Sequence, residues 1–262
     1  MYRFLLRPRW LLFHLLVVGA IVLMVNLGFW QLRRFDERQQ FNAQVETSIA
    51  APPAPLDDVL AAGTDPATVE WRRVSATGTY LPAETIAVVN RSQGGAAGDL
   101  IVTPLQLDDG RILLVERGFV PLSATADLPP AGQVEVSGRL RPSQERRRGG
   151  LSDPSSGELR EAQRVDVDRL AAQLPGPLVP MYVELVSSTP PEAAASMVPV
   201  AIPDLVDGPH LSYAGQWFIF AIAVGVGWVL AVRRSVRFRV TTATDVAAPE
   251  PEDERTAAPS SR

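Results

Sequence analysis

Long apolar stretches without charge lie near both ends of the chain. The first covers residues 10–30 and the second residues 211–232. At 1.5 Å per residue in an α-helix, the twenty steps of the first stretch cover about 30 Å, the thickness of the hydrocarbon core of a bilayer. Tryptophan at both edges of the first stretch is typical of a membrane interface. The pattern predicts transmembrane helices at residues 10–30 and 210–232.

The first helix is expected to remain in the mature protein as an anchor. Its apolar stretch is longer than the core of a cleaved signal peptide, and no small-x-small cleavage site follows it. No arginine- and serine-rich amphipathic segment precedes it, which favours a bacterial plasma membrane over a mitochondrion. The helix is expected to continue over residues 31–49 and to end before the prolines at 52–55.

The placement of arginine predicts the orientation. Arginines flank the outer ends of both apolar stretches, at Arg3, Arg7, Arg9, Arg233, Arg234, Arg237 and Arg239. At the inner ends arginine is mixed with acidic residues or replaced by them. The positive-inside rule then places the N-terminus (1–9) and the basic flank and tail (233–262) in the cytoplasm, and residues 31–209 outside. The polar, acidic part of the tail after Arg239 is expected to be disordered.

Between the two stretches, apolar and polar residues alternate as in β-strands with one buried face. Strands are expected at 73–80, 85–90, 100–107, 111–120, 133–140 and 181–186, with a hairpin at Asp108-Asp109-Gly110. A helix is expected at 166–174, with Asp166 near its start. Loops are expected at 121–132, 142–157 and 187–204. The predicted fold class is a membrane protein whose two terminal transmembrane helices flank a β-rich α+β extracytoplasmic domain, a compact antiparallel sheet or barrel.

The amino-acid composition excludes several kinds of functional site. The chain has no cysteine, two histidines and no lysine among its 25 basic residues. Disulfides, thiolate metal sites, a three-histidine metal centre and lysine chemistry are therefore excluded. The acidic pairs Asp57-Asp58 and Asp108-Asp109 read as turn residues. With 16 Arg against 24 Asp and Glu, residues 31–209 carry a net charge of −8. A nucleic-acid partner is not expected, and neither is enzymatic activity.

The two histidines occupy opposite ends of the predicted helix pair. His14 lies near the cytoplasmic edge of the first helix, where a hydrogen bond within the helix pair would explain it. His210 opens the second helix, with Asp207 as a candidate N-cap and Pro209 in the first turn. Because most of a bilayer separates the two imidazoles, they cannot bind one metal ion, and a haem held by both is excluded.

A polar and aromatic stripe begins at His210. Helical spacing places His210, Tyr213 or Ala214, and Trp217 on one face. Asn26, Trp30 and Gln31 of the first helix are expected at the same depth. The stripe is either an interfacial belt without a ligand or a contact site for haem or quinone, since neutral histidine can ligate haem iron. Small residues would allow close helix packing, at Gly19, Ala20, Ala221, Ala223, Gly225 and Gly227.

The run Arg146-Arg147-Arg148 lies in an expected loop. It is either a solvated loop or a clamp for carboxylates, such as haem propionates or an acidic partner surface.

Several motifs together resemble the Surfeit locus protein 1 family of cytochrome c oxidase assembly factors. They occur in order at 28–34 (GFWQLRR), 103–105 (TPL), 110–121 (GRILLVERGFVP), 138–141 (GRLR) and 209–218 (PHLSYAGQWF). The resemblance covers roughly residues 20–232. The chain departs from the family pattern at Glu116, where asparagine is frequent, and at Phe35-Asp36-Glu37, where tryptophan and lysine are common.

The resemblance implies a role in maturing the haem–copper oxidase. It implies that the chain handles haem a for the catalytic subunit, with His210 as axial ligand of the haem iron. Trp217, Tyr213, Trp30 and Gln31 are the other candidate cofactor-binding residues. Expected partners are the catalytic subunit, the lipid bilayer and the haem a synthesis machinery. The alternative is a membrane scaffold that stabilises an oxidase intermediate without touching haem.

Overall fold

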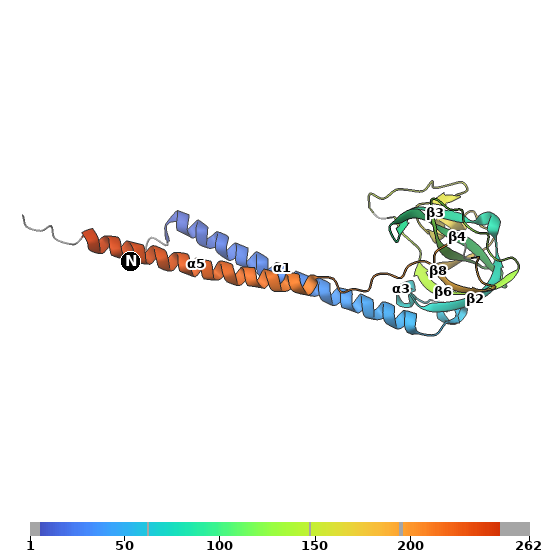
Figure 1. Cartoon of the computed structure of the whole chain (residues 1–262), viewed down its shortest axis with the longest axis horizontal. Coiled ribbons are helices and arrows are strands. Elements are labelled where there is room, and N and C mark those ends of the chain that lie inside the picture. The colour runs from blue at the N-terminus through green and yellow to red at the C-terminus, as the bar shows by residue number, and fades with distance from the viewer. Residues whose placement is uncertain (1–5, 62, 147, 194–195, 247–262) are drawn as a thin grey trace, which may run out of the picture. The chain divides into compact units, whose positions relative to one another are not determined.

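The computed structural model describes residues 6–61, 63–146, 148–193 and 196–246. Within these residues the chain forms two compact units. A helical unit comes from Met1–Gln39 and Asp207–Arg262, and a sheet unit from Gln40–Val206. Figure 1 labels the two long helices and several elements of the sheet unit.

The helical unit consists of the greater part of α1 (Pro8–Ala50) and of α5 (His210–Val246). Both helices are long and apolar enough to cross a membrane, and only 11% and 6% of their most apolar windows are buried in the protein. The core helix of a soluble domain would be mostly buried, so a surrounding apolar phase fits these surfaces better than water does. The expected continuation of the first helix over 31–49 is present.

The second helix extends further than expected. It continues to Val246, whereas disorder was predicted after Arg239, because residues 240–246 contain neither proline nor glycine to interrupt it. The remainder of the predicted disordered tail, 247–262, lies outside the described residues.

The two helices pack antiparallel. As residue numbers rise along α1, the contacted numbers fall along α5, from Trp228 beside His14 to His210 beside Gln31. Gly28 permits a close approach, because a Cβ there would lie 2.7 Å from the Phe218 ring. Of the expected packing residues, Ala221 is buried and Gly225 lies near Ile21, but a Cβ at Gly19 or Gly227 would meet nothing within 4 Å.

The sheet unit contains eight strands and several short helices. In chain order these are β1 (Ala54–Pro55), α2 (Leu56–Val59), α3 (Pro66–Val69), β2 (Arg73–Tyr80), the 3-10 helix η2 (Pro82–Glu84), β3 (Ile86–Gln93), β4 (Ala96–Leu107), β5 (Ile112–Pro121), β6 (Gln133–Pro142), β7 (Glu161–Ala162), α4 (Val167–Ala171) and β8 (Leu178–Thr189). All six predicted strands are present. The predicted helix is shorter at its C-terminal end, and Asp166 caps it by accepting a hydrogen bond from the Arg169 amide.

Five of the strands close into a barrel. The order is β2-β6-β8-β5-β4, and β4 pairs again with β2 through Gly78↔Leu107 and its neighbours. The sheet is mixed, not antiparallel as predicted, because β5 and β8 pair in parallel. Parallel neighbouring strands need a long crossover connection, which here runs through β6 and α4. The alternation of apolar and polar residues within a strand does not reveal whether it pairs in parallel or antiparallel.

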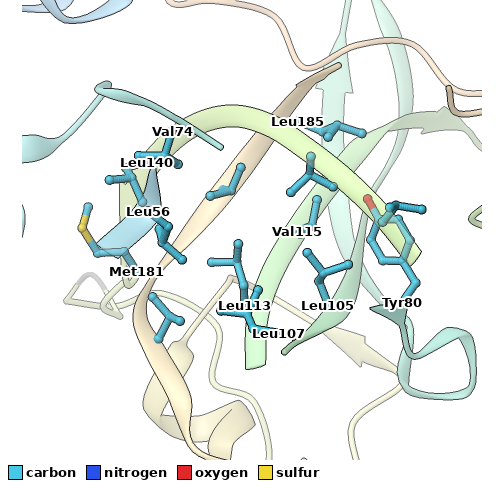
Figure 2. Close-up of a cluster of buried hydrophobic side chains, with 14 residues drawn as sticks. Leu56, Val74, Tyr80, Leu105, Leu107, Leu113, Val115, Leu140, Met181 and Leu185 are labelled. Carbon is cyan, nitrogen blue, oxygen red and sulfur yellow. The ribbon is translucent and has the colours of Figure 1, made fainter. Parts of the chain in front are cut away.

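Three apolar clusters hold this unit together, and two of them are large. The first fills the barrel with residues from all five strands, among them Tyr80, Leu105, Val115, Leu140 and Met181, as Figure 2 shows. The second covers part of the outside, where β3 and segment 159–170 pack on Leu114 and Tyr182. Covered on both faces, β5 is buried along Ile112–Val120. It therefore lacks the alternation of β6, whose first residues are exposed and buried in turn.

The two acidic pairs differ in their surroundings. Asp108-Asp109 lies in the expected hairpin turn before Gly110, whose φ of 86° suits glycine. Asp57-Asp58 was also read as turn residues, but it lies in the first turn of α2. Carboxylates are favourable there because they face the unsatisfied N–H groups of the helix start.

Candidate functional site

His210 is the first residue of α5. The Pro209 carbonyl accepts hydrogen bonds from the Tyr213 amide, at 3.1 Å, and from the Ser212 hydroxyl, at 2.7 Å. Pro209 therefore directly precedes the helix. The predicted N-cap Asp207 lies outside it, because Gly208, with a φ of 73°, turns the chain between the two.

The imidazole of His210 contacts the predicted residue Gln31 across the helix pair. Its Nδ1 lies 2.9 Å from the Gln31 side-chain oxygen. With that oxygen as the acceptor, Nδ1 is the donor, and in a neutral imidazole with this tautomer the lone pair lies on Nε2. Among the described residues, no hydrogen bond to Nε2 is found. A hydrogen bond through one ring nitrogen fixes the direction of the imidazole and leaves the other nitrogen unengaged.

Glycine at position 208 keeps the space beside the imidazole open. A Cβ there would lie 3.5 Å from both Nε2 and Cδ2 of His210. Gly208 was not among the candidate residues predicted from the sequence. The Gly-Pro-His order was its only signal, and the positive φ of Gly208 accounts for the glycine at that position.

The predicted aromatic residues are less closely gathered. Tyr213 and Trp30 are 48% and 47% exposed, and the Trp217 ring meets Phe220 edge-on, at 6.1 Å between centroids. No ring contact joins any of the three to His210 within the described chain. Asn26 was expected at the same depth as His210, and its amide donates to the Val22 carbonyl of its own helix at 2.8 Å.

His14 has a different environment. Its Nδ1 accepts a hydrogen bond of 2.8 Å from the Trp228 indole, and the two rings meet nearly perpendicularly. This is the hydrogen bond within the helix pair expected from the sequence. From His14 to Gln31, the contact of His210, α1 rises about 26 Å, so the two histidines are too far apart to share a metal ion. The described residues contain no cluster of three or more metal-binding side chains.

A buried charged group on the outer face of the barrel was missed by sequence reasoning. Glu116 and Glu184 are opposite each other in β5 and β8, and both are buried. Arg139 and Arg141 of β6 each lie 3.1 Å from Glu184. Burial, followed by the charge of Glu184, raises the pKa of Glu116 to about 8. Burial also raises the pKa of Glu184, while Arg141 and Arg139 oppose the shift.

A second buried ion pair joins Arg117 to Glu192. The Nε of Arg117 donates to a Glu192 carboxylate oxygen at 3.0 Å, and Nη1 donates to the Asp127 carbonyl at 3.0 Å. The Arg117 side chain is only 1% exposed. Nearby, burial and the charge of Glu192 raise the pKa of Tyr80. The pair ties segment 191–193 to β5.

The arginine run gives no evidence of a clamp. Arg146 is exposed and donates to the Ser152 hydroxyl, and Arg148 is also exposed. Arg147 lies outside the described residues. Both interpretations of the run stay predictions.

Comparison with known proteins identifies the family to which the chain is similar. A model of the SURF1 family matches residues 18–222, which include both Gln31 and His210. A SURF1-like protein of Mycobacterium tuberculosis is 31% identical over 232 residues, covering 86% of this chain and 83% of that protein. A SURF1-like protein of Rickettsia felis is 25% identical over 236 residues, covering 85% and 97%. The cytochrome oxidase assembly protein SHY1 of Saccharomyces cerevisiae is 30% identical over 157 residues, covering 54% and 39%.

Proposed function

We propose that this chain, which belongs to the SURF1 family, is a membrane-anchored assembly factor of cytochrome oxidase that binds haem a at His210. Family membership and the similarity to a yeast oxidase assembly protein support the assembly role. The contact between His210 and Gln31 is the observation that carries the haem-binding part. The acceptor is the catalytic subunit of the oxidase, and the haem a synthesis machinery is the expected donor.

The residues around His210 fit an iron porphyrin. Neutral imidazole is a usual axial ligand of haem iron, and the Gln31 contact leaves Nε2 as the atom that would bind it. Gly208 places no side chain beside that atom. The exposed rings of Tyr213 and Trp30 belong to the same helix pair and offer apolar surface to a flat macrocycle.

Each residue has a separate task in this proposal. His210 binds the iron, and Gln31 fixes the tautomer and the direction of the ring. With a single protein ligand, haem would be held weakly enough to be passed on, and it would supply the redox chemistry only after transfer to the oxidase. No catalytic step is assigned to this chain.

The two apolar helices support a place in the plasma membrane. In this proposal both helices cross the bilayer, both termini are cytoplasmic and the sheet unit lies outside, as arginine placement predicts. His210 would then lie at the outer edge of the membrane, where it can meet a membrane-embedded partner.

Replacing His210 by alanine is expected to abolish haem a binding, because the axial ligand is lost. The full-length protein is expressed in cells that make haem a and purified in detergent, and its optical spectrum is recorded. His14→Ala is the matched control. It removes the other histidine of the helix pair and is expected to retain the haem. Equal haem content in wild type and His210→Ala would show that the ligand is misassigned.

Deletion of the gene is expected to lower both oxidase activity and membrane haem a content, because the catalytic subunit would not receive its cofactor. Complementation with His210→Ala separates two roles. Failure to restore activity supports haem delivery. Full restoration by a pigment-free variant favours the haem-independent scaffold.

A further inference from the structure

A solvent-open cleft in the sheet unit is lined mainly by arginine and glutamine. Its volume is about 590 Å³, and it lies between β3, the end of β6 and segment 150–164. The polar side chains of its lining are Arg91, Arg141, Gln144, Glu145, Gln163 and Arg164, and Glu145 among them is exposed. Three guanidinium groups lie in one cleft of a domain with a net negative charge. Each positive charge needs a partner that compensates it.

Two of these guanidinium groups already have carboxylate partners. Arg141 lies 2.9 Å from Glu70 and 3.1 Å from Glu184. Arg164 lies 3.3 Å from Asp153. Their charges are therefore compensated within the protein.

Arg91 is different. Its Nη2 donates to the backbone carbonyl of Gln163 at 2.8 Å, which is a neutral partner. Its Nε is buried and makes no hydrogen bond to any residue that the structure describes. No carboxylate of the described chain lies within ion-pair distance of it. A buried donor without an acceptor is unfavourable, so its presence requires an explanation.

The backbone before Arg91 has an unusual conformation. Asn90 has a φ of 62°, in the left-handed region that non-glycine residues seldom adopt. The pairing of β3 with β4 shifts register between Val88 and Arg91, so a β-bulge lies here. Bulges redirect side chains and gather near functional sites. Asn90 also donates to the Gln163 side chain at 3.3 Å, which ties the bulge to the cleft wall.

A buried carboxyl that interacts electrostatically with Arg91 does not neutralise it at neutral pH. Glu116 lies within electrostatic range of Arg91, Arg139 and Arg141, yet burial raises its pKa to about 8. It is therefore mostly protonated at pH 7. Arg91 remains a cation without an ionised partner in the described chain.

We propose that this cleft binds a carboxylate group of an exogenous ligand, with Arg91 as the residue that pairs with it. A guanidinium group matches a carboxylate in shape and can donate two parallel hydrogen bonds, and Arg91 lines this cleft without a carboxylate partner in the described chain. The carboxylate comes either from a small organic acid or from an acidic side chain of a protein. This site is separate from His210, and the inference does not rest on the proposed haem function.

The test is calorimetric titration of the full-length protein in detergent. One probe is succinate, and the other is a blocked tripeptide, acetyl-Gly-Glu-Gly-amide, whose only carboxylate is the side chain. Saturable binding of at least one probe is expected, and the stronger probe identifies the source. The Gln analogue of the peptide is expected not to bind.

Arg91→Gln is expected to weaken binding at least tenfold. Arg160→Gln removes an equal charge from an exposed residue outside the cleft and should bind like wild type. Asn90→Gly keeps the left-handed backbone and should also retain binding, whereas Asn90→Val strains it and should weaken binding. The proposal is overturned if neither probe binds saturably, or if Arg91→Gln and wild type bind equally.

Discussion

Replacing Glu116 by glutamine is expected to stabilise the sheet unit at pH 8 and to leave its stability at pH 4.5 nearly unchanged. The pKa of Glu116 rises from 4.5 to about 8 on burial. Folding therefore favours the protonated form, and stability present below pH 4.5 is lost as the pH rises towards 8. At 1.36 kcal/mol per pKa unit, the loss is on the order of 4 kcal/mol. Glutamine has nearly the same shape and carries no charge.

The measurement is urea unfolding of the full-length protein across this pH range. Trp71, the one tryptophan in 40–206, reports on the sheet unit when the other four are replaced by phenylalanine. Glu145→Gln is the matched control at an exposed position, and its effect should be small at every pH. If Glu116→Gln left the pH dependence between 4.5 and 8 unchanged, Glu116 would not be the group that titrates.

Glu192→Met is expected to lower the free energy of unfolding by about 3–5 kcal/mol. Arg117 would then keep a charge that is 1% exposed, with the Asp127 carbonyl as its remaining acceptor. A buried carboxyl can become neutral by binding a proton, but arginine does not become neutral by losing one. The same fluorescence assay in urea measures the loss.

The double variant Arg117→Met/Glu192→Met should be more stable than Glu192→Met alone, because the isolated charge is gone. Glu158→Met breaks an ion pair whose side chains are more than half exposed, and its effect should stay below about 1 kcal/mol. Equal losses for Glu192→Met and Glu158→Met would contradict the importance of burial.

The regular elements were predictable because each has a strong local pattern. The uncharged stretches predicted both long helices. Alternation, apolar runs and turn signals together predicted all six longer strands, including β2 with its observed bounds. The family resemblance was predicted from short motifs and is confirmed by the match over residues 18–222. The parallel pairing of β5 and β8 was not predictable, because it depends on which strands meet and not on the sequence of either.

The candidate site was predictable to a lesser degree. His210 and Gln31 were both named from the sequence, and the structure brings them into contact. The depth argument brought this pair together because Gln31 follows the first apolar stretch directly and His210 precedes the second. The expectation for Asn26 stays a prediction, and Gly208 was missed because its importance depends on a backbone angle.

The buried charges could not be found from the sequence. In the sequence, Glu116 and Arg91 look like ordinary strand residues. Only the pairing of the strands shows which residues surround them. Glu116 meets Glu184 only because β8 lies beside β5, and Arg91 enters its cleft only because of the bulge at Asn90. Such contacts join residues far apart in the chain, and one-dimensional patterns do not encode them.

The two covered faces of β5 have a consequence for how this protein can change over time. In the first half of β6, every second residue is exposed to solvent, so many substitutions at those positions are expected to have little effect on stability. Along Ile112–Val120 no position faces water. Most amino-acid replacements that change side-chain size or polarity in that stretch are therefore expected to destabilise the sheet unit, so tolerated variation is expected mainly at exposed positions elsewhere.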